Sequence, residues 1–317
     1  MRGPTRMLYA NLIDAIGNTP LVEMPRMSPK PAVRLYAKLE GQNPSGSVKD
    51  RIAMYMIEEA ERTGVLTKDR VVLEPTSGNT GISLAMICRI KGYRLKVVIP
   101  ESVSAERTEL LTAFGAEIVY SDGLRGTNGS IEVAQQIAAE DPAYYMPYQY
   151  GNEMNPRAHY ETTGPEILRD LPEIDVFVAG LGTGGTLTGT GRFLKEMKPG
   201  VKVVAAVPHP GDLVQGLRSL EEGFIPPVLD ERVLDGKIVV DSRTSFAASK
   251  ELTQREGIFA GISAGAVLKT AQRIAERLDA GNIVCLFADG GWKYLSTQLW
   301  TTDYEDLPQD IEDKIWW

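Results

Sequence analysis

The sequence predicts an α/β protein whose strands lie mostly parallel. Short apolar runs typical of buried strands alternate with amphipathic, helix-like segments along the chain. A chain of 317 residues, 43% hydrophobic and 24% charged, has an ordinary globular composition and can bury a large core. No internal repeat or low-complexity linker is visible. These observations favour layered α/β architecture in two lobes.

The expected strands are apolar runs bounded by turn-forming residues. They cover residues 33–38, 71–74, 95–99, 117–120, 176–179, 201–207 and 283–287. Two helical segments follow polar loops, one at 50–63 and one that runs from the loop at 76–81 to about Ile90. Strands that alternate with helices in this way indicate parallel sheets.

Charge and cysteine content narrow the class of protein. With 34 basic and 42 acidic residues the formal net charge is −8, which disfavours a nucleic-acid partner. Cys88 and Cys285 are isolated thiols that make neither a metal site nor a disulfide framework, so we expect both to be buried. No signal-peptide run is visible, and no stretch approaches the ~18 apolar residues of a membrane span. We expect a cytoplasmic protein with no metal and no membrane partner.

One lysine stands in a loop suited to a flat cofactor. Residues 43–51 read Asn-Pro-Ser-Gly-Ser-Val-Lys-Asp-Arg, which delivers Lys49 to the start of the helix at 50–63. Small neighbours let a planar group lie close, and local desolvation lets the amine lose its proton and attack an aldehyde. A lysine at a helix N-terminus is more often a solvated charge, so the interpretation depends on further motifs.

Two further segments predict anion-binding loops. The first, 71–81, is an apolar strand followed by Thr-Ser-Gly-Asn-Thr-Gly and a helix, and its hydroxyls and amides suit a carboxylate. The second, 175–186, is a strand that opens into Gly-Leu-Gly-Thr-Gly-Gly-Thr, whose unhindered N–H groups suit a phosphate at a helix N-terminus.

Competing functions fit the sequence less well. Gly180, Gly182 and Gly185 match the short dinucleotide fingerprint, but the strand at 202–207 ends in Val-Pro where a ribose-binding acid is expected. His159 and His209 are the only histidines, and neither lies near a serine in a nucleophile-elbow context. We expect packing for His159 and loop exposure for His209, and we assign acid–base work to Lys49.

The ordered motifs resemble the cysteine synthases, the β-replacement branch of fold-type II pyridoxal phosphate enzymes. The resemblance runs from about Leu12 to Trp300. Besides the lysine loop and the two anion loops, it includes Ile-Gly-Asn-Thr-Pro-Leu at 16–21, Gln-Tyr-Gly-Asn at 149–152, Thr-Thr-Gly-Pro-Glu at 162–166 and Gly-Ile-Ser-Ala-Gly at 261–265. It implies a tryptophan synthase β-like fold with two three-layer α/β/α lobes and pyridoxal 5'-phosphate in the cleft between them. The smaller lobe would comprise 1–11 and 36–150, and the larger lobe 12–35 and 151–317.

The resemblance implies a role for each site residue. Lys49 would hold the cofactor as a Schiff base, Asn79 would hydrogen-bond the ring hydroxyl, and Ser263 would face the pyridine nitrogen. The cofactor phosphate would be bound by Gly182, Thr183, Gly184, Gly185 and Thr186. The substrate carboxylate would be bound by Thr76, Ser77, Thr80 and Gln149. Asp50, Arg51 and Asp289 are expected to be helix-end or supporting charges.

The implied reaction is a two-stage replacement. Lys49, displaced from the aldehyde by the substrate, removes the α-proton; the β-substituent leaves, and a sulfur nucleophile adds to the resulting aminoacrylate to give L-cysteine. A serine hydroxyl opposite the ring nitrogen does not keep that nitrogen protonated, so the cofactor is a weaker electron sink, which favours elimination over transamination.

The substrate branch depends on one departure from the commoner family pattern. Residues 215–218 read Gln-Gly-Leu-Arg where O-acetylserine enzymes usually have Gln-Gly-Ile-Gly, and Arg218 can make a bidentate pair with phosphate. This variation, with Gly-Trp-Lys-Tyr-Leu-Ser-Thr at 291–297, resembles O-phosphoserine sulfhydrylases that take sulfur from a thiocarboxylated, ubiquitin-like carrier protein. Val207, where the family is expected to have glutamate, leaves the local substrate contacts open.

The same motifs fit several alternative functions. An O-acetylserine sulfhydrylase using sulfide, a cystathionine β-synthase-like enzyme and a non-enzymatic partner-binding scaffold would share these motifs, and Arg218 could instead pair with Glu221 or Glu222 at the surface. The tail carries six carboxylates at 303–313 and ends in Ile-Trp-Trp, which suits a lid over the active site or docking on the surface of an expected homodimer.

Overall fold

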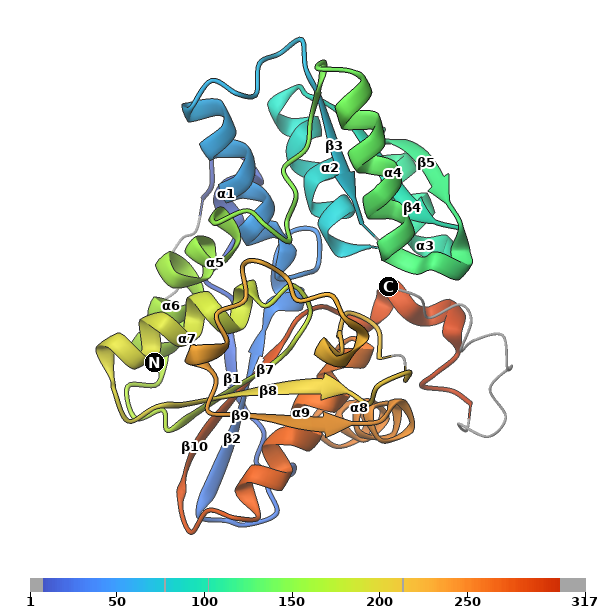
Figure 1. The fold of residues 1–317 in the computed structure, drawn as a ribbon. Coiled ribbons are helices and arrows are strands. Elements are labelled where there is room, and N and C mark those ends of the chain that lie inside the picture. Colours follow the sequence, from blue (N-terminus) through green and yellow to red (C-terminus); the bar gives the residue numbers. More distant parts are fainter. Residues whose placement is uncertain (1–7, 77, 102, 213, 303–317) are drawn as a thin grey trace.

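The computed structural model describes residues 8–76, 78–101, 103–212 and 214–302. In this part of the chain two mostly parallel sheets, one of six strands and one of four, form the centres of two lobes (Figure 1). The predicted site residue Ser77 and the acidic tail at 303–317 lie outside the described residues. Within the described part, no helix combines the length and apolar character needed to cross a membrane.

The six-stranded sheet builds the larger lobe. Its strand order is β1 (Leu21–Glu23), β2 (Val33–Leu39), β10 (Gly281–Phe287), β7 (Val176–Gly180), β8 (Lys202–Pro208) and β9 (Gly236–Val240). Only the β1–β2 pair is antiparallel. The expected lobe boundary between residues 35 and 36 falls inside β2, which pairs with β10 along its whole length.

Helices cover both faces of the larger sheet. α9 (Ile262–Ala275) contacts four of its strands, and α8 (Ser242–Glu256) packs on α9. α7 (Gly185–Met197) lies on the other face with α5 (Met154–Ala158) and α6 (Gly164–Asp170). The strands divide their side chains accordingly. In β7, Val178 joins the core under α9, whereas Phe177 and Ala179 join the core under α7.

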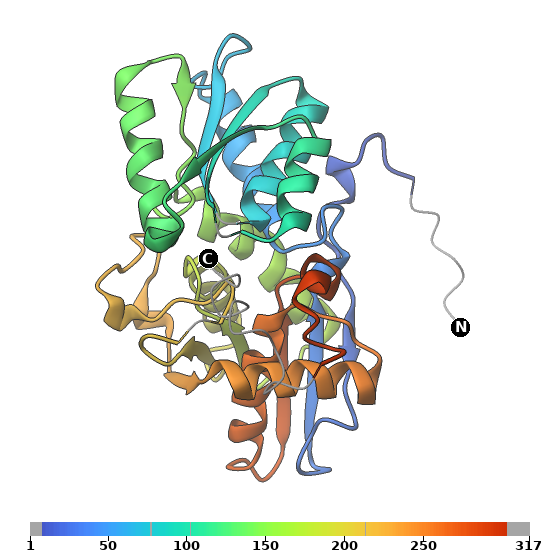
Figure 2. The same ribbon diagram turned by 90° about the vertical axis from the view of Figure 1, so that its right-hand side faces the viewer.

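The four-stranded sheet builds the smaller lobe. Its order is β5 (Glu117–Ser121), β4 (Arg94–Pro100), β3 (Val71–Pro75) and β6 (Tyr144–Tyr145), all parallel. α4 (Gly126–Glu140) lies on one face, and α1 (Lys49–Arg62), α2 (Asn79–Lys91) and α3 (Ala105–Ala113) lie on the other (Figure 2). β3 follows the same alternation as β7, because Val72 packs toward α2 and Leu73 toward α4.

All the expected strands are present, with ends that shift by one or two residues. The sequence reading missed β1, β6 and β9, which are short or have alternately exposed residues and carry no long apolar run. The helix expected at 50–63 begins one residue earlier, so Lys49 is its first residue. Cys88 and Cys285 are buried, as predicted.

A buried cluster of charges joins α1 to the larger lobe. Arg51 donates to Glu40 at 2.7 and 2.8 Å and to Glu166 of α6 at 2.7 Å through each of two nitrogens. Lys38 of β2 donates to Glu166 Oε2, which Arg51 also contacts, at 2.7 Å and to the Thr19 carbonyl at 2.6 Å. Each charge has opposite-charge partners with hydrogen-bond geometry, the condition under which buried ion pairs are tolerated. Arg51 is thus a structural anchor two residues beyond Lys49.

Replacing Arg51 by methionine removes the donors and leaves two buried carboxylates. We expect Arg51→Met to lower the free energy of unfolding by about 3–5 kcal/mol, because a buried charge loses its partner. Urea unfolding followed by circular dichroism measures this loss. Arg62→Met is the matched control on the same helix, where Arg62 pairs with Glu59 in solvent and should contribute little. Similar losses for both variants would contradict the anchoring role.

The pH dependence of this difference gives a second test. Burial alone would raise the pKa of Glu40, but the charge and hydrogen bonds of Arg51 lower it to about 2. A carboxylate with a lowered pKa in the folded state stabilises the fold above its ordinary pKa of 4.5, and this contribution is lost as pH falls toward 2. We therefore expect the gap between wild type and Arg51→Met to shrink below pH 4.5. A difference in the free energy of unfolding that stays constant down to pH 3 would contradict this explanation.

Candidate active site

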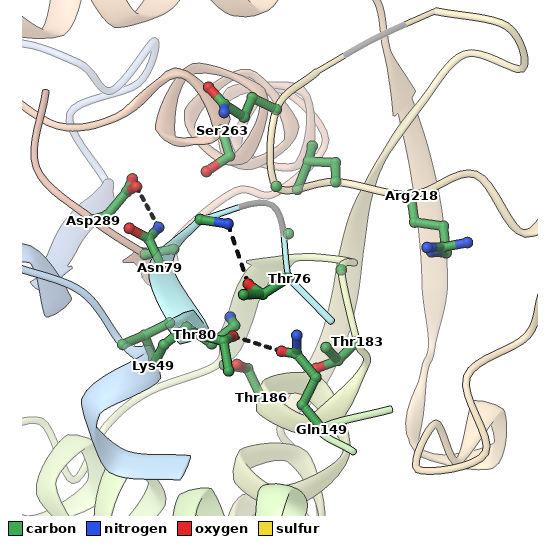
Figure 3. A pocket seen from close by; sticks show the side chains of 18 of the residues that line it. Lys49, Thr76, Asn79, Thr80, Gln149, Thr183, Thr186, Arg218, Ser263 and Asp289 are labelled. Atoms are coloured by element: carbon green, nitrogen blue, oxygen red, sulfur yellow. Dashed lines mark hydrogen bonds between the residues drawn. The ribbon is translucent and has the colours of Figure 1, made fainter. Parts of the chain in front are cut away.

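The loops at the carboxyl ends of several strands meet in one pocket between the lobes (Figure 3). This is the edge at which open parallel sheets bind ligands. The predicted site residues that line it are Lys49, Thr76, Asn79, Thr80, Gln149, Gly182, Thr183, Gly184, Thr186, Arg218 and Ser263. Gly185 is the first residue of α7, directly behind the glycine loop.

Lys49 is half-buried at the start of α1, and its loop is fixed from two sides. The Val48 N–H donates to the Ala288 carbonyl at 2.8 Å, and Ser47 forms a β-bridge with Asp289. On the side of α1, the Asp50 carboxylate accepts the Ser45 N–H at 2.7 Å. Burial lowers the pKa of the Lys49 amine, against the opposing charges of Asp289 and Glu40. The amine therefore loses its proton more readily than an exposed lysine.

The first anion loop connects β3 to α2. The Gly78 N–H donates to Thr76 Oγ1 at 3.2 Å, which tightens the turn, and the Thr80 hydroxyl donates to Gln149 Oε1 at 2.7 Å. The N-terminus of α2 begins immediately after Gly78, so its free N–H groups point into the pocket region that the two threonines and Gln149 surround. This arrangement can bind a carboxylate.

Glu74, a residue of β3, holds Gln149 in place. Its buried carboxylate accepts the N–H groups of Tyr148 at 2.8 Å and Gln149 at 3.0 Å. Tyr148 has φ of 56°, a left-handed conformation that is unfavourable for a bulky residue and needs such support. Burial raises the pKa of Glu74 to about 7, against the two backbone hydrogen bonds.

The second anion loop connects β7 to α7 and requires glycine. Gly184 has φ of +84°, and a Cβ on Gly182 would lie 2.7 Å from the Gly216 carbonyl oxygen. The Thr183 and Thr186 side chains flank the N-terminus of α7, where helix N–H groups favour an anion. His159 is buried as predicted, and its Nε2 lies 3.2 Å from Thr186 Oγ1, a contact that the sequence did not reveal. Burial lowers the pKa of His159 to about 3, so it stays neutral.

Asn79 lies in a polar cluster with Asp289, Lys293 and Tyr294. Its Nδ2 donates to Asp289 at 2.7 Å, and its Oδ1 accepts from the buried Lys293 amine at 2.7 Å. Tyr294 donates to the same Asp289 carboxylate. Burial lowers the pKa of Lys293 to about 8. Asp289 is thus a supporting charge, and Lys293 orients the Asn79 amide.

Arg218 lies in the pocket wall and is 8% exposed. Its guanidinium carbon is 4.7 Å from the centre of the Phe224 ring and 5.6 Å from that of Tyr150. Among the described side chains, no carboxylate lies within ion-pair distance of it, so the pairing with Glu221 considered from the sequence is not formed; the side chain of Glu222 is not described. Ser263 lies in the first turn of α9 and faces the same pocket, at the other side from Arg218 in Figure 3.

The sequence reading overlooked Arg107. It is buried, lines the pocket and lies with its guanidinium carbon 5.2 Å from the centre of the Tyr294 ring. A Cβ on Gly78 would approach its Nε at 3.0 Å, so Arg107 supports the back of the first anion loop. No motif marks this residue, because it lies inside the ordinary helical segment α3.

Comparison with known proteins agrees with this geometry. The family model of pyridoxal-phosphate dependent enzymes matches residues 12–289. A probable cysteine synthase of Bacillus subtilis is 44% identical over 306 residues, which are 93% of this chain and 98% of that protein. O-ureido-L-serine synthase superposes with a TM-score of 0.89 at 38% identity, covering 96% of this chain and 99% of that one.

A third similar protein is a hydrogen sulfide-producing enzyme from Fusobacterium nucleatum, with a TM-score of 0.85 and 41% identity over 90% of this chain and all of that chain. The similarity thus extends over nearly the whole length of each protein. Because the family model spans most of the chain and the sequence identity is high throughout, this chain belongs to the cysteine synthase family of pyridoxal-phosphate dependent enzymes.

Proposed function

We propose that this protein is a cysteine synthase that replaces the phosphate of O-phospho-L-serine with sulfur. The observation that supports the substrate is Arg218, a buried cation in the same pocket as Lys49 and without a described carboxylate partner. A guanidinium in a partly dry site binds a phosphate through two parallel hydrogen bonds and discriminates against a neutral ester.

The pocket fits pyridoxal phosphate. A Cβ at Gly182 or Gly184 would collide with neighbouring atoms at 2.7 Å, so these positions keep the loop tight and its N–H groups unobstructed. We assign the cofactor phosphate to Gly182, Thr183, Gly184, Gly185 and Thr186, the ring hydroxyl to Asn79 and the ring nitrogen to Ser263. Lys49 would carry the aldehyde carbon. When bound, the cofactor supplies an electron sink for the substrate α-carbon.

The protein's own groups then divide the remaining work. Thr76, Thr80 and Gln149 bind the substrate carboxylate, together with Ser77. This contact orients the Cα–H bond toward Lys49. Lys49 Nζ accepts the α-proton and later returns it, a role that its lowered pKa favours because the amine must be uncharged to act as a base. Arg218 binds the phosphate that leaves.

The sulfur donor and the assembly are further parts of the proposal. We propose a thiocarboxylated, ubiquitin-like carrier protein as donor, from the resemblance of residues 215–226 and 291–297 to that branch. We propose a homodimer as the working form, from the resemblance to the family as a whole. The second candidate is an O-acetylserine sulfhydrylase that uses sulfide. The names of the similar proteins leave room for it, since they mention cysteine synthesis, hydrogen sulfide production and O-ureido-L-serine but not O-phosphoserine.

Mixing the holoenzyme with each substrate in a stopped-flow spectrometer decides between these candidates. The visible absorbance of the cofactor changes when the β-substituent departs. We expect a faster change with O-phosphoserine than with O-acetylserine. A faster change with O-acetylserine would favour the second candidate, and no change with either would point to another β-substituted amino acid.

Lys49→Ala tests the assignment of the reactive amine. We expect turnover to fall by at least about 10³-fold, because both the covalent anchor and the base are lost. The visible absorbance of the purified protein should fall with it. Lys293→Ala is the control, since it removes the buried lysine that bonds Asn79. If Lys293→Ala abolished the covalent anchor, shown by mass spectrometry after borohydride reduction, and Lys49→Ala kept it, the assignment would be wrong.

Arg218→Ala tests the substrate. We expect kcat/KM for O-phosphoserine to fall by about 10–100-fold, the value of a lost charge-assisted hydrogen-bond pair, while kcat/KM for O-acetylserine changes much less. Steady-state kinetics on both substrates measures the ratio. Arg192→Ala, whose side chain pairs with Asp230 on the surface, should leave both values unchanged. Equal losses on both substrates for Arg218→Ala would refute the phosphate contact.

A further inference from the structure

Asn155 occupies a buried position between the two anion loops. It is the second residue of α5 and is only 1% exposed. Its Nδ2 donates to the Gln149 carbonyl at 2.8 Å and to Thr183 Oγ1 at 3.1 Å. One amide nitrogen therefore bonds a residue of the carboxylate-binding group and a residue of the glycine loop at the same time.

The other half of the amide faces the glycine loop as well. Asn155 Oδ1 is buried and has no hydrogen-bond partner among the described residues. A Cβ on Gly185 would lie 1.9 Å from this oxygen, so the amide is pressed against the first turn of α7.

The surroundings of Asn155 leave it little freedom to move. Its backbone N–H donates to the Asn152 carbonyl at 2.9 Å, and a Cβ on Gly189 would lie 1.9 Å from the carbonyl of the next residue, Pro156. α5 and α7 are thus in backbone contact. Gln149 is fixed from its other side, because its N–H donates to Glu74. Gln149 and the glycine loop are therefore linked through the single side chain of Asn155.

We propose that Asn155 is a positioning residue that couples the carboxylate-binding group, through Gln149, to the phosphate-binding loop, through Thr183. This inference depends on the proposed function, which assigns those two roles. It implies that filling the phosphate loop with the cofactor orders Gln149 for the amino acid. Coupling of this kind is reciprocal, so the loss of Asn155 weakens both binding events.

The experiment measures the dissociation constant of pyridoxal phosphate from the apoprotein by fluorescence, and KM and kcat of the reloaded enzyme for the amino-acid substrate. We expect Asn155→Ala to weaken cofactor binding about fivefold, the value of one lost hydrogen bond, and to raise KM by a similar factor. Asn152→Ala is the matched control in the same turn. Its side chain bonds the Pro147 carbonyl and the Met154 N–H but neither Gln149 nor Thr183, so Asn152→Ala should leave cofactor binding unchanged.

A double-mutant cycle separates coupling from a general loss of structure. Because Asn155 and Thr183 share one hydrogen bond, the double variant Asn155→Ala, Thr183→Val should lose less cofactor affinity than the product of the two single losses. Losses that multiply would overturn the proposal, as would wild-type cofactor affinity in Asn155→Ala. If Thr183→Val itself binds the cofactor like wild type, the assignment of the phosphate loop fails instead, which distinguishes the two failures.

Discussion

The geometry of the pocket depends on the buried guanidinium of Arg51. Glu40 and Glu166 bond its donors on two sides; Glu40 directly follows β2, and Glu166 belongs to α6. Lys49 begins the same helix two residues earlier. Because the guanidinium of Arg51 is planar and bonded on two sides, it fixes the direction and the position of the N-terminal turn of α1. Buried ion pairs contribute little net stability compared with apolar packing, so the main contribution of Arg51 is to fix the position of α1.

Two further buried carboxylates fix loops around the pocket, here by accepting backbone N–H groups. Asp50 accepts the Ser45 N–H of the lysine loop, and Glu74 accepts the N–H groups of the turn that carries Gln149. Burial raises the pKa of both carboxyl groups, in Glu74 to about 7. These acids shape the loops of the pocket. Lys49, which we propose as the base, has a lowered pKa and lines the pocket.

The sequence predicted the parts of this site that have local signatures. Lys49, the glycine loop and the Thr-Ser-Gly-Asn-Thr-Gly loop follow strands and precede helices, so a short window identifies them. Asn155, Arg107 and the Lys293–Asn79 bond could not be found in this way, because each is defined by a partner distant in sequence. Likewise, β9 and β6 owe their existence to pairing with β8 and β3, since their own residues are half exposed or very few.

The substrate preference that we propose depends on where Arg218 is anchored. Its N–H donates to the Leu181 carbonyl at 2.7 Å, and the neighbouring Gly216 carbonyl oxygen lies 2.7 Å from the position that a Cβ on Gly182 would take. The loop of Arg218 is therefore packed directly on the glycine loop that we assign to the cofactor phosphate. A substrate phosphate in the same pocket would bring a second multiply charged anion close to the first, and their repulsion is strong in a partly dry site. A buried cation on this loop offsets that repulsion, whereas a neutral ester needs no such charge. O-ureido-L-serine synthase has a closely similar fold at 38% identity. Because a shared fold does not by itself fix the substrate, we look for the proposed preference in side chains such as Arg218.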